Sequence, residues 1–310
     1  MKKNSEKIIN AAVVVPTLNA GSVWCDWIDA LLITKKDVND IYIIDSSSSD
    51  DTVSLSCEAG FNVDKINPAS FNHGGTRQSA VDRLDDYEVV VFLTQDAILA
   101  SPDSIDDLLK AFEDPMVGAA YGRQLPRRSA SLIEAHSRLF NYTNKSRVNS
   151  FEDAKELGMK TAFMSNSFAA YRRSALHDVG GFPTNSIVSE DMYAAARMLM
   201  QNWKIAYCAD AQVYHSHGYS IFQEFQRYFD IGVFNARESW IREAFGQAEP
   251  EGGRFVRSEL KFLLLNNPLL LPASILRTCF KLLGYKFGIN ESLFPVSVKR
   301  AFSMQKNYWN

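Results

Sequence analysis

Residues 89–100, VVVFLTQDAILA, decide the fold. Five apolar residues, rich in Val and Phe, run directly into Thr94, Gln95 and Asp96. A short apolar run of this kind predicts a strand that is buried on both faces of a parallel sheet. A carboxylate at the carboxyl end of such a strand lies at the edge where open α/β sheets bind ligands. Because an unpaired buried carboxylate is costly, we expect Asp96 to face water, a cation or a donor; the alternative is a turn residue that caps the next helix.

Apolar runs on both sides of this stretch alternate with segments of helical spacing. The predicted strands are residues 8–15, 40–45, 61–66, 89–93, 117–121, 164–171, 204–207 and 212–214. The predicted helices are residues 24–32, 72–84, 101–112, a helix from about 131, 192–201 and 221–245, and residues 147–161 are expected to form a loop around a short helix. This alternation is typical of a doubly wound α/β domain with a mostly parallel sheet. Neither the dinucleotide fingerprint GxGxxG after the first strand nor the P-loop GxxxxGK[ST] occurs.

The composition is that of a folded protein with an uneven charge distribution. The 310 residues, 46% hydrophobic and 22% charged, suffice for one large α/β domain with an appendage. A net charge of −3 gives no electrostatic match to nucleic acid. Residues 254–310 nevertheless contain nine Lys or Arg against two Asp or Glu, so the remainder is acidic. This asymmetry predicts that the tail meets an anionic surface.

The cysteines and the apolar runs indicate a cytoplasmic protein. Cys25, Cys57, Cys208 and Cys279 lack CxxC spacing and predict reduced, structural thiols. The apolar run 11–15 is too short for a signal peptide. No stretch reaches the roughly 18 to 20 apolar residues that a membrane span needs.

Two polar motifs follow predicted strands in the first half of the chain. SSSSDDT, residues 46–52, suits either a helix cap with its loop or the lining of a polar ligand site. NHGGTR, residues 72–77, opens a helix; its paired glycines allow close backbone approach, and helix N-termini favour anions. Arg77 adds donors suited to a phosphate or a base edge, although a glycine turn with a surface arginine is the plainer alternative.

Two further motifs in the second half carry titratable groups. Ser189, Glu190 and Asp191 open a helix, where a Ser cap with acids in the first turn is ordinary capping chemistry. VYHSH places His215 and His217 on one face of an extended chain. The two imidazoles are candidate ligands of a divalent cation, and the alternative is one structural and one exposed histidine.

The basic tail alternates leucines and phenylalanines with cations. Pro268 and Pro272 divide residues 254–288 into two predicted helices. A basic amphipathic segment predicts binding at the interface of an anionic membrane. The alternative is a pair of core helices that close the domain. The cations concerned are Arg257, Lys261, Arg277, Lys281 and Lys286.

Taken in order, these motifs resemble glycosyltransferase family 2, the inverting enzymes of GT-A fold. The motifs are PTLN, IIDSSSSDDT, NHGGTR, LTQDA, GGF, SED and VYHSH. Four longer stretches are similar to the rhamnosyltransferases of bacterial O-antigen and capsule assembly. They are FNHGGTR, FLTQDA, SEDMYAAARML and WKIAYCADAQVYHSHGYS. The resemblance covers about residues 8–290.

The resemblance implies a nucleotide-sugar site at the carboxyl ends of the first strands. Asp45 would hold the base or ribose, Thr17 and Asn19 would line the same pocket, and Arg77 would contact the base or diphosphate. The full set of implied nucleotide-sugar residues is Pro16, Thr17, Asn19, Asp45, Ser47, His73, Gly74, Arg77, Gln95 and Asp96.

The resemblance also implies a metal ion and a general base. Asp96 matches the last acid of the family's DxD motif, while Thr94 stands in place of the first. Mg²⁺ or Mn²⁺ would then be held by Asp96 with His215 or His217. Glu190-Asp191 matches the ED motif, in which the Asp takes the proton of the acceptor hydroxyl as that oxygen attacks opposite the leaving diphosphate. The metal and nearby cations would stabilise the charge on the leaving group.

The expected protein is an inverting transferase that moves L-rhamnose from dTDP-L-rhamnose to a polyprenyl-diphosphate-linked saccharide. It would work in cell-surface polysaccharide synthesis, peripherally bound to the inner face of the bacterial cytoplasmic membrane. Residues 1–250 would form the GT-A domain, with a nucleotide-sugar half (8–122) and an acceptor half (123–250), and 251–310 a helical C-terminal region.

Three alternatives stay open at this point. The first is a family-2 transferase that uses a UDP- or GDP-sugar. The second is a nucleotidyltransferase, which the lack of a glycine-rich basic loop after the first strand disfavours. The third is a non-catalytic nucleotide-sugar or lipid-binding subunit, for which Thr94 is the only support.

Overall fold

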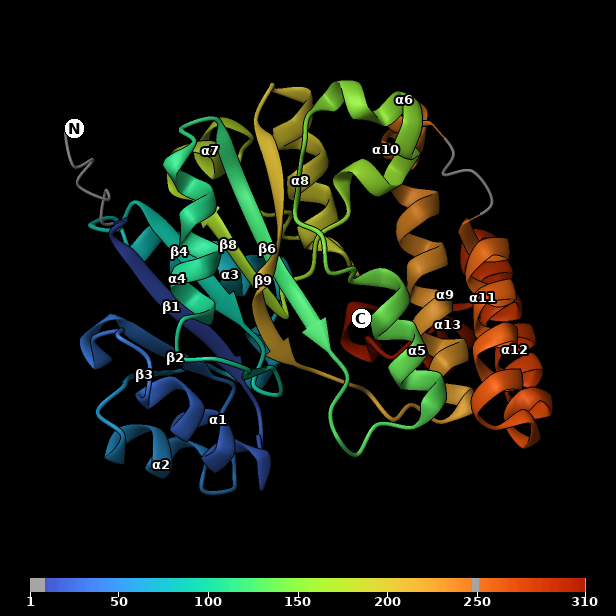
Figure 1. Ribbon diagram of the computed structural model, residues 1–310, viewed down its shortest axis with the longest axis horizontal. Helices are drawn as coiled ribbons and strands as arrows, with labels where there is room; N and C mark the ends of the chain where they lie inside the picture. Colours follow the sequence, from blue (N-terminus) through green and yellow to red (C-terminus); the bar gives the residue numbers. More distant parts are fainter. Residues whose placement is uncertain (1–8, 247–250, 310) are drawn as a thin grey trace.

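The computed structural model describes residues 9–246 and 251–309. Within these residues nine strands form one curled sheet, ordered β3-β2-β1-β4-β8-β6-β9-β5, with β7 paired to β9 beside this path (Figure 1). The strands are β1 (Ala11–Thr17), β2 (Ile41–Asp45), β3 (Asn62–Lys65), β4 (Val89–Leu93), β5 (Ile98–Leu99), β6 (Val117–Leu125), β7 (Arg147–Asn149), β8 (Phe168–Arg172) and β9 (Lys204–Tyr214). Ile8, the predicted start of the first strand, lies outside the described residues.

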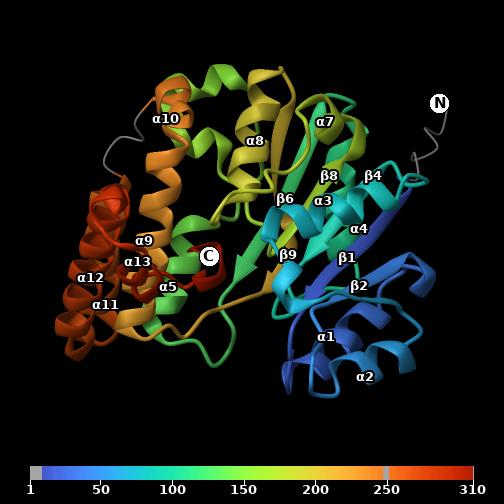
Figure 2. The ribbon, with the colours of Figure 1, turned by 180° about the vertical axis from the view of Figure 1, so that it is seen from behind.

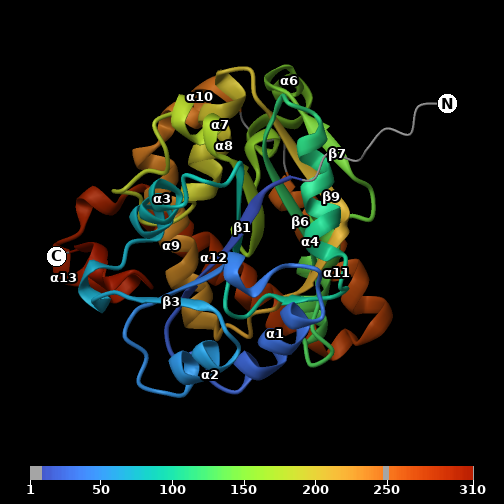
Figure 3. The same cartoon turned by 90° about the vertical axis from the view of Figure 1, so that its left-hand side faces the viewer.

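Helices cover both faces of the sheet, and further helices lie to one side of it. They are α1 (Val23–Leu32), α2 (Thr52–Glu58), α3 (His73–Arg83), α4 (Ser104–Leu109), α5 (Leu132–Asn141), α6 (Ala154–Leu157), α7 (Arg173–Asp178), α8 (Glu190–Met200), α9 (Ile221–Arg237), α10 (Ser239–Phe245), α11 (Glu251–Asn266), α12 (Leu271–Ile289) and α13 (Val296–Phe302). α3, α7 and α8 lie on one face, and α4 lies on the other (Figures 2 and 3).

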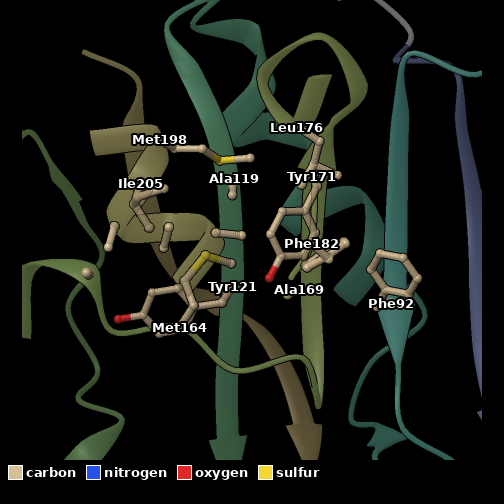
Figure 4. Packing of buried hydrophobic residues seen from close by; sticks show 14 of the residues in the cluster. Phe92, Ala119, Tyr121, Met164, Ala169, Tyr171, Leu176, Phe182, Met198 and Ile205 are labelled. Carbon is tan, nitrogen blue, oxygen red and sulfur yellow. The ribbon is translucent and has the colours of Figure 1, made fainter. Parts of the chain in front are cut away.

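β4 is buried on both faces, as its sequence predicts. Its five residues are all buried, and consecutive side chains enter opposite cores because strand side chains alternate. Val90 and Phe92 pack with residues of α3, α7 and α8, whereas Val91 packs with residues of α1 and α4. On the first face Phe92 lies 5.9 Å from Tyr171, centroid to centroid, in an edge contact (Figure 4). β4 therefore links the two hydrophobic cores.

The sheet is mostly parallel, as expected, but one strand inside it runs the other way. β1 pairs in parallel with β2 and β4, and β6 pairs in parallel with β9. β8 lies between β4 and β6 and is antiparallel to both. Strand direction depends on how the connecting segments run in space, and an apolar run carries no direction of its own.

Several predicted elements differ from the structure. The predicted helix 221–245 is two helices, α9 and α10, which are separated at Glu238, and the predicted strand 164–171 begins only at Phe168. The predicted strands 204–207 and 212–214 are the two ends of one strand, β9. Its register on β6 jumps from Cys208 to Gln212, because Ala209-Asp210-Ala211 form an irregularity that bends the strand without ending it. The predicted loop 147–161 begins with a strand, β7, on the edge of β9.

The C-terminal helices are packed against the body of the protein on one face only. α12 lies along α9 so closely that a Cβ at Gly284 would be 2.2 Å from the Phe225 carbonyl oxygen, and a Cβ at Gly288 2.1 Å from that of Phe229. The predicted boundary near residue 250 falls among residues 247–250, which the structure does not describe. The alternative that these helices close the domain is therefore correct for their inner face.

The cations of α12 are not all on its outer face, contrary to the sequence expectation. Arg277 Nη1 lies 3.1 Å, and Lys281 Nζ 3.5 Å, from Glu224 Oε1 on α9. Arg277 and Lys281 thus point inward toward the Glu224 carboxylate. Leucines of the same helix, such as Leu282 and Leu283, are exposed. None of the described helices is long and apolar enough to span a bilayer.

We expect Gly288→Ala to destabilise the protein. Alanine favours a helix by up to about 1 kcal/mol over glycine, but overpacking against a rigid backbone costs about 1–3 kcal/mol, so the clash prevails. Urea unfolding should show a lower free energy of unfolding. Gly252→Ala on α11 is the matched control, because nothing lies within 4 Å of its Cβ position. Equal stability of the two variants would contradict this packing.

Candidate functional site

The ends of β1 and β2 are tied together by a buried carboxylate. Thr17 and Asp45 are in register, and the Thr17 hydroxyl donates to Asp45 Oδ2 at 2.7 Å. The Ser48 amide and hydroxyl donate to the same carboxylate at 2.7 and 2.6 Å. Asp45 is fully buried, so in this structure its carboxylate orders the loops after the two strands. Its predicted contact with a base or ribose stays a prediction.

The loop after β1 is held from the β4 side as well. Gln95 Oε1 accepts from the Leu18 amide at 2.8 Å, and Gln95 Nε2 donates to the Leu18 carbonyl at 3.1 Å. Asn19 has a positive φ of 47°, and its Oδ1 accepts from the Ser49 amide. Ser47 is turned the other way, and its hydroxyl donates to the Ile66 carbonyl. The predicted nucleotide residues after β1, β2 and β4 thus lie in one connected group of loops. Pro16, which precedes Thr17 in β1, is half-buried.

A second group lies where β4 and β9 end. Asp96 Oδ2 is 3.2 Å from His215 Nε2 and 3.5 Å from His217 Nδ1. His215 is buried, and its Nε2 has no hydrogen-bond partner among the described residues. The Asp96 carbonyl accepts from Arg127, and His217 stacks on Tyr219 with ring centroids 4.9 Å apart. The structure therefore brings together all three residues predicted to hold a metal.

Electrostatics leave this group as a carboxylate facing neutral imidazoles. Burial lowers the pKa of His215, and burial with the neighbouring His215 lowers the pKa of His217 to about 3. Burial alone would raise the pKa of Asp96, but the neighbouring His215 and His217 outweigh it and hold the pKa below its usual range. Asp96 is therefore ionised, and both imidazoles lose a proton more readily than a free histidine does.

The residues present fit a divalent cation. One ligand atom from each of Asp96, His215 and His217 lies within 4.8 Å of the other two. In an octahedral site with bonds of about 2.1 Å, neighbouring ligand atoms are about 3.0 Å apart. The observed separations of 3.2 and 3.5 Å are close to that value. Thr94 Oγ1, where the family motif has its first acid, is buried without a hydrogen-bond partner in the described chain.

A third group surrounds the start of α8. Asp191 Oδ2 accepts from the Asn166 amide at 3.0 Å, and its Oδ1 accepts from its neighbour Met192 at 2.8 Å. Ser189 does not cap the helix, contrary to the sequence expectation: it has a φ of 61° and its side chain makes no capping bond. The left-handed turn at Ser189 places Glu190 and Asp191 in the first turn of α8 with different surroundings.

Glu190 is buried and paired with Arg77. Arg77 Nη1 lies 2.9 Å from Glu190 Oε1, and Asn166 Nδ2 donates to the same oxygen at 2.9 Å. The Arg77 side chain is only 4% exposed and also donates to the His73 carbonyl. Gly74 has no room for a Cβ, which would lie 1.9 Å from the Pro183 carbonyl oxygen. NHGGTR thus packs α3 against the ED motif, and its predicted contacts with a nucleotide sugar stay untested.

The two acids of the ED motif have opposite pKa shifts. Burial would raise the pKa of Glu190, but Arg77 outweighs burial and lowers it. Burial, together with the negative charge of Glu190, raises the pKa of Asp191 to about 6. An aspartate with this pKa is ionised at neutral pH and still basic enough to accept a proton, as a general base requires.

Side chains that sequence reasoning did not single out connect these groups. Gln124 lies 2.8 Å from His215 Nδ1 and donates to the Ser165 hydroxyl, and the next residue, Asn166, donates to Asp191. Arg138 on α5 donates to Gln124 Oε1 at 2.8 Å. These residues belong to no recognisable motif; the only signal was polar side chains within apolar strands or beside them.

Comparison with known families places the chain in a group of transferases. The family described as "Glycosyltransferase like family 2" matches residues 10–229. The chain is 48% identical over 299 residues to the O-antigen chain rhamnosyltransferase RfbN of Salmonella typhimurium, covering 96% of this chain and 95% of that protein. It has the same identity and coverage with the O-antigen chain rhamnosyltransferase WbaN of Salmonella anatum.

Solved structures share the fold. The mannosyltransferase PcManGT from Pyrobaculum calidifontis, in complex with GDP-Man and Mn²⁺, superposes with a TM-score of 0.56 at 19% identity, covering 98% of this chain and 86% of that one. Residues 1–349 of S. aureus TarS, in complex with UDP-GlcNAc, superpose with a TM-score of 0.53 at 14% identity, covering 97% and 90%. The sheet is the expected GT-A fold, and the chain belongs to glycosyltransferase family 2.

Proposed function

We propose that the protein is an inverting rhamnosyltransferase that moves L-rhamnose from dTDP-L-rhamnose to a lipid-linked saccharide of a cell-surface polysaccharide such as O-antigen. The observation that carries the proposal is the carboxylate Asp191, whose pKa is raised. Asp191 is linked through Asn166, Ser165 and Gln124 to the cluster of Asp96, His215 and His217. The likeness to O-antigen chain rhamnosyltransferases supports the choice of sugar.

In the proposed reaction Asp191 takes the proton of the acceptor hydroxyl. That oxygen forms a bond to the anomeric carbon while the bond from this carbon to the diphosphate breaks, and the dTDP oxygen keeps the electron pair. Glu190 and Arg77 do not touch the reacting atoms in this scheme. The buried charge of Glu190 raises the basicity of Asp191, and Arg77 keeps Glu190 ionised.

Asp96, His215 and His217 would hold Mg²⁺ or Mn²⁺ beside the donor diphosphate. A cation bound there supplies positive charge for the diphosphate as it leaves. The imidazole donors favour Mn²⁺, because Mg²⁺ prefers oxygen ligands. The loops around Asp45 and Gln95, at the same edge of the sheet, are the proposed place of the nucleoside.

The acceptor is proposed to reach the site from a membrane surface on the outer face of α11 and α12. Exposed apolar side chains on α12 include the pairs Ile275-Leu276 and Leu282-Leu283, about two helical turns apart, and others continue into the segments before and after the helix. The residues proposed to face the lipid are Leu264, Leu265, Leu269, Ile275, Leu276, Leu282, Leu283, Ile289, Leu293 and Val296.

The charges of the same surface suit anionic lipid. Between residues 254 and 310 the two acids are hidden: Glu259 is buried against Ser274, and Glu291 is paired with Arg237 and Lys299. The exposed cations include Arg254, Arg257, Lys261, Lys286 and Arg300. The surface therefore offers apolar side chains and positive charge, without exposed negative charge.

The proposed membrane surface is connected to the metal cluster. Arg277 of α12 donates to the Tyr219 carbonyl at 2.9 Å, and the Tyr219 ring stacks on His217. A saccharide presented at the membrane would thus approach close to the loop that carries the histidines. We propose peripheral binding at the inner face of the cytoplasmic membrane, where nucleotide sugars are available.

The pH dependence of turnover tests the base. We expect kcat/KM to fall as pH decreases through about 6, with a single-proton slope, because protonated Asp191 cannot accept the hydroxyl proton. Asp191→Asn should lower kcat by at least about 10²-fold while dTDP-L-rhamnose binding, measured by calorimetry, is retained. An acid limb near pH 4, or an active Asp191→Asn, would show that another group is the base.

A donor panel tests the sugar and the metal together. Release of nucleoside diphosphate should occur with dTDP-L-rhamnose, in the presence of acceptor and Mn²⁺, and should stop in EDTA. UDP-glucose, UDP-galactose and GDP-mannose should give at most about 1% of this rate, a margin that several kcal/mol of specific contacts would supply. Preference for a UDP- or GDP-sugar would refute the rhamnosyl assignment, and donor binding without any turnover would favour the non-catalytic subunit.

Paired serine substitutions test the membrane surface in the full chain. Leu269→Ser with Leu283→Ser should weaken binding to phosphatidylcholine–phosphatidylglycerol vesicles by at least about 100-fold in sedimentation assays, because each buried Leu contributes about 1.5–3 kcal/mol and about 1.4 kcal/mol corresponds to a tenfold change. Leu32→Ser with Ile33→Ser is the matched control: these side chains are also exposed, but on α1 and directly after it, at the opposite side of the molecule (Figure 1). Equal loss in both pairs, or none in either, would contradict the surface.

A further inference from the structure

The side chain of Gln124 contacts a charged donor, a hydroxyl and an imidazole. Gln124 belongs to β6 and is only 2% exposed. Its Oε1 is 2.8 Å from Arg138 Nη1 and 2.8 Å from His215 Nδ1, and its Nε2 donates to the Ser165 hydroxyl at 2.8 Å. Every polar atom of this buried amide is therefore engaged.

Arg138 determines which way the amide is turned. A guanidinium has donors only, so the amide atom that faces it must be the oxygen. The reversed amide would place its NH₂ group against Arg138 and leave two donors facing each other. Oε1 of Gln124 therefore also faces His215, and an oxygen that cannot donate requires a proton on His215 Nδ1.

A neutral imidazole with its proton on Nδ1 has a lone pair on Nε2. This atom is buried, has no hydrogen-bond partner in the described chain, and lies 3.2 Å from Asp96 Oδ2. Two acceptors at this separation repel each other unless a metal cation or a second imidazole proton lies between them. The hydrogen bonds of Gln124 thus turn His215 into a ligand before any ion arrives.

His217 lacks such a constraint. Its Nδ1 faces Asp96 Oδ2 at 3.5 Å, its side chain is 31% exposed, and no described residue hydrogen-bonds its ring. It is held by stacking on Tyr219, which sets the plane of the ring but not its tautomer.

We propose that Gln124, oriented by Arg138, is a positioning residue that fixes the Nδ1-protonated tautomer of His215 and so makes His215 Nε2 the principal imidazole ligand of the divalent cation, with His217 secondary. This inference rests on the proposed function only in taking a divalent cation as the occupant of the cluster. The same amide also holds Ser165, next to Asn166, which donates to Asp191. Gln124 thereby sets the place of the cation relative to the base.

The first test is the tautomer in the metal-free protein. Long-range ¹H–¹⁵N spectra of ¹⁵N-histidine-labelled protein distinguish the protonated from the unprotonated ring nitrogen, and His215→Gln assigns the signal. We expect protonated Nδ1 and unprotonated Nε2 for His215 in the wild type. A wild-type His215 protonated on Nε2 would overturn the proposal.

The second test is the affinity for Mn²⁺ alone, measured by electron paramagnetic resonance of the free ion. Gln124→Met removes the acceptor and should lower the affinity by about 10- to 100-fold, whereas Gln124→Glu keeps an oxygen at the same place and should stay within about threefold of the wild type. Gln212→Met, in the adjoining strand, is the matched control and should leave the affinity unchanged, because the side-chain amide of Gln212 donates to the Ala209 carbonyl and not to the histidines.

The outcomes separate this proposal from the function on which it rests. Unchanged Mn²⁺ affinity in Gln124→Met, equal losses in Gln124→Glu and Gln124→Met, or His217→Gln costing more affinity than His215→Gln would each overturn it. If Gln124→Met does not fold, two other results still test the proposal. One is the tautomer of His215 in the wild type, and the other is the Mn²⁺ affinity, which should be retained in Gln124→Glu and lost in Arg138→Met. The expected tautomer and affinities without sugar transfer would refute the rhamnosyltransferase alone.

Discussion

The buried ion pair between Arg77 and Glu190 is the interaction on which the site depends. It joins α3 to the first turn of α8. Removing one partner of a buried pair typically costs about 3–5 kcal/mol, because the other charge stays buried without compensation. Here the pair also acts on its neighbour: the retained negative charge of Glu190, with burial, raises the pKa of Asp191 to about 6. The Arg77–Glu190 pair therefore affects both the stability of the fold and the basicity of Asp191.

The antiparallel strand β8 explains why Asp191, the proposed base, lies close to the cluster of Asp96, His215 and His217. It is inserted between β4, which leads to Asp96, and β6, which carries Gln124. The residues just before β8, Ser165 and Asn166, therefore lie at the same edge as the ends of those two strands. A fully parallel sheet would begin β8 at the opposite edge and leave no backbone there to hold Asp191.

The C-terminal helices have two faces with different tasks. The inner face of α12 is packed so tightly against α9 that two glycines are required, and its cations pair with Glu224. The outer face is apolar and lacks exposed acids. The inner face of α12 supports the loop that contains Tyr219. Removal of α11 and α12 would therefore disturb the cluster of Asp96, His215 and His217 as well as any membrane contact.

Local sequence determined much of this protein. The uninterrupted apolar run of β4 can only be stable between two cores, and the polar residues that follow it must then lie at the edge of the sheet. The order of the motifs was sufficient to indicate the family, and the spacing of two histidines indicated candidate metal ligands. Tertiary structure decided the rest. The tautomer of His215, the burial of Arg77 and the inward cations of α12 all depend on partners between 53 and 113 residues away along the chain. Hydrogen bonds and ion pairs of that kind leave no periodic pattern, because each needs only one polar side chain at one place in the fold.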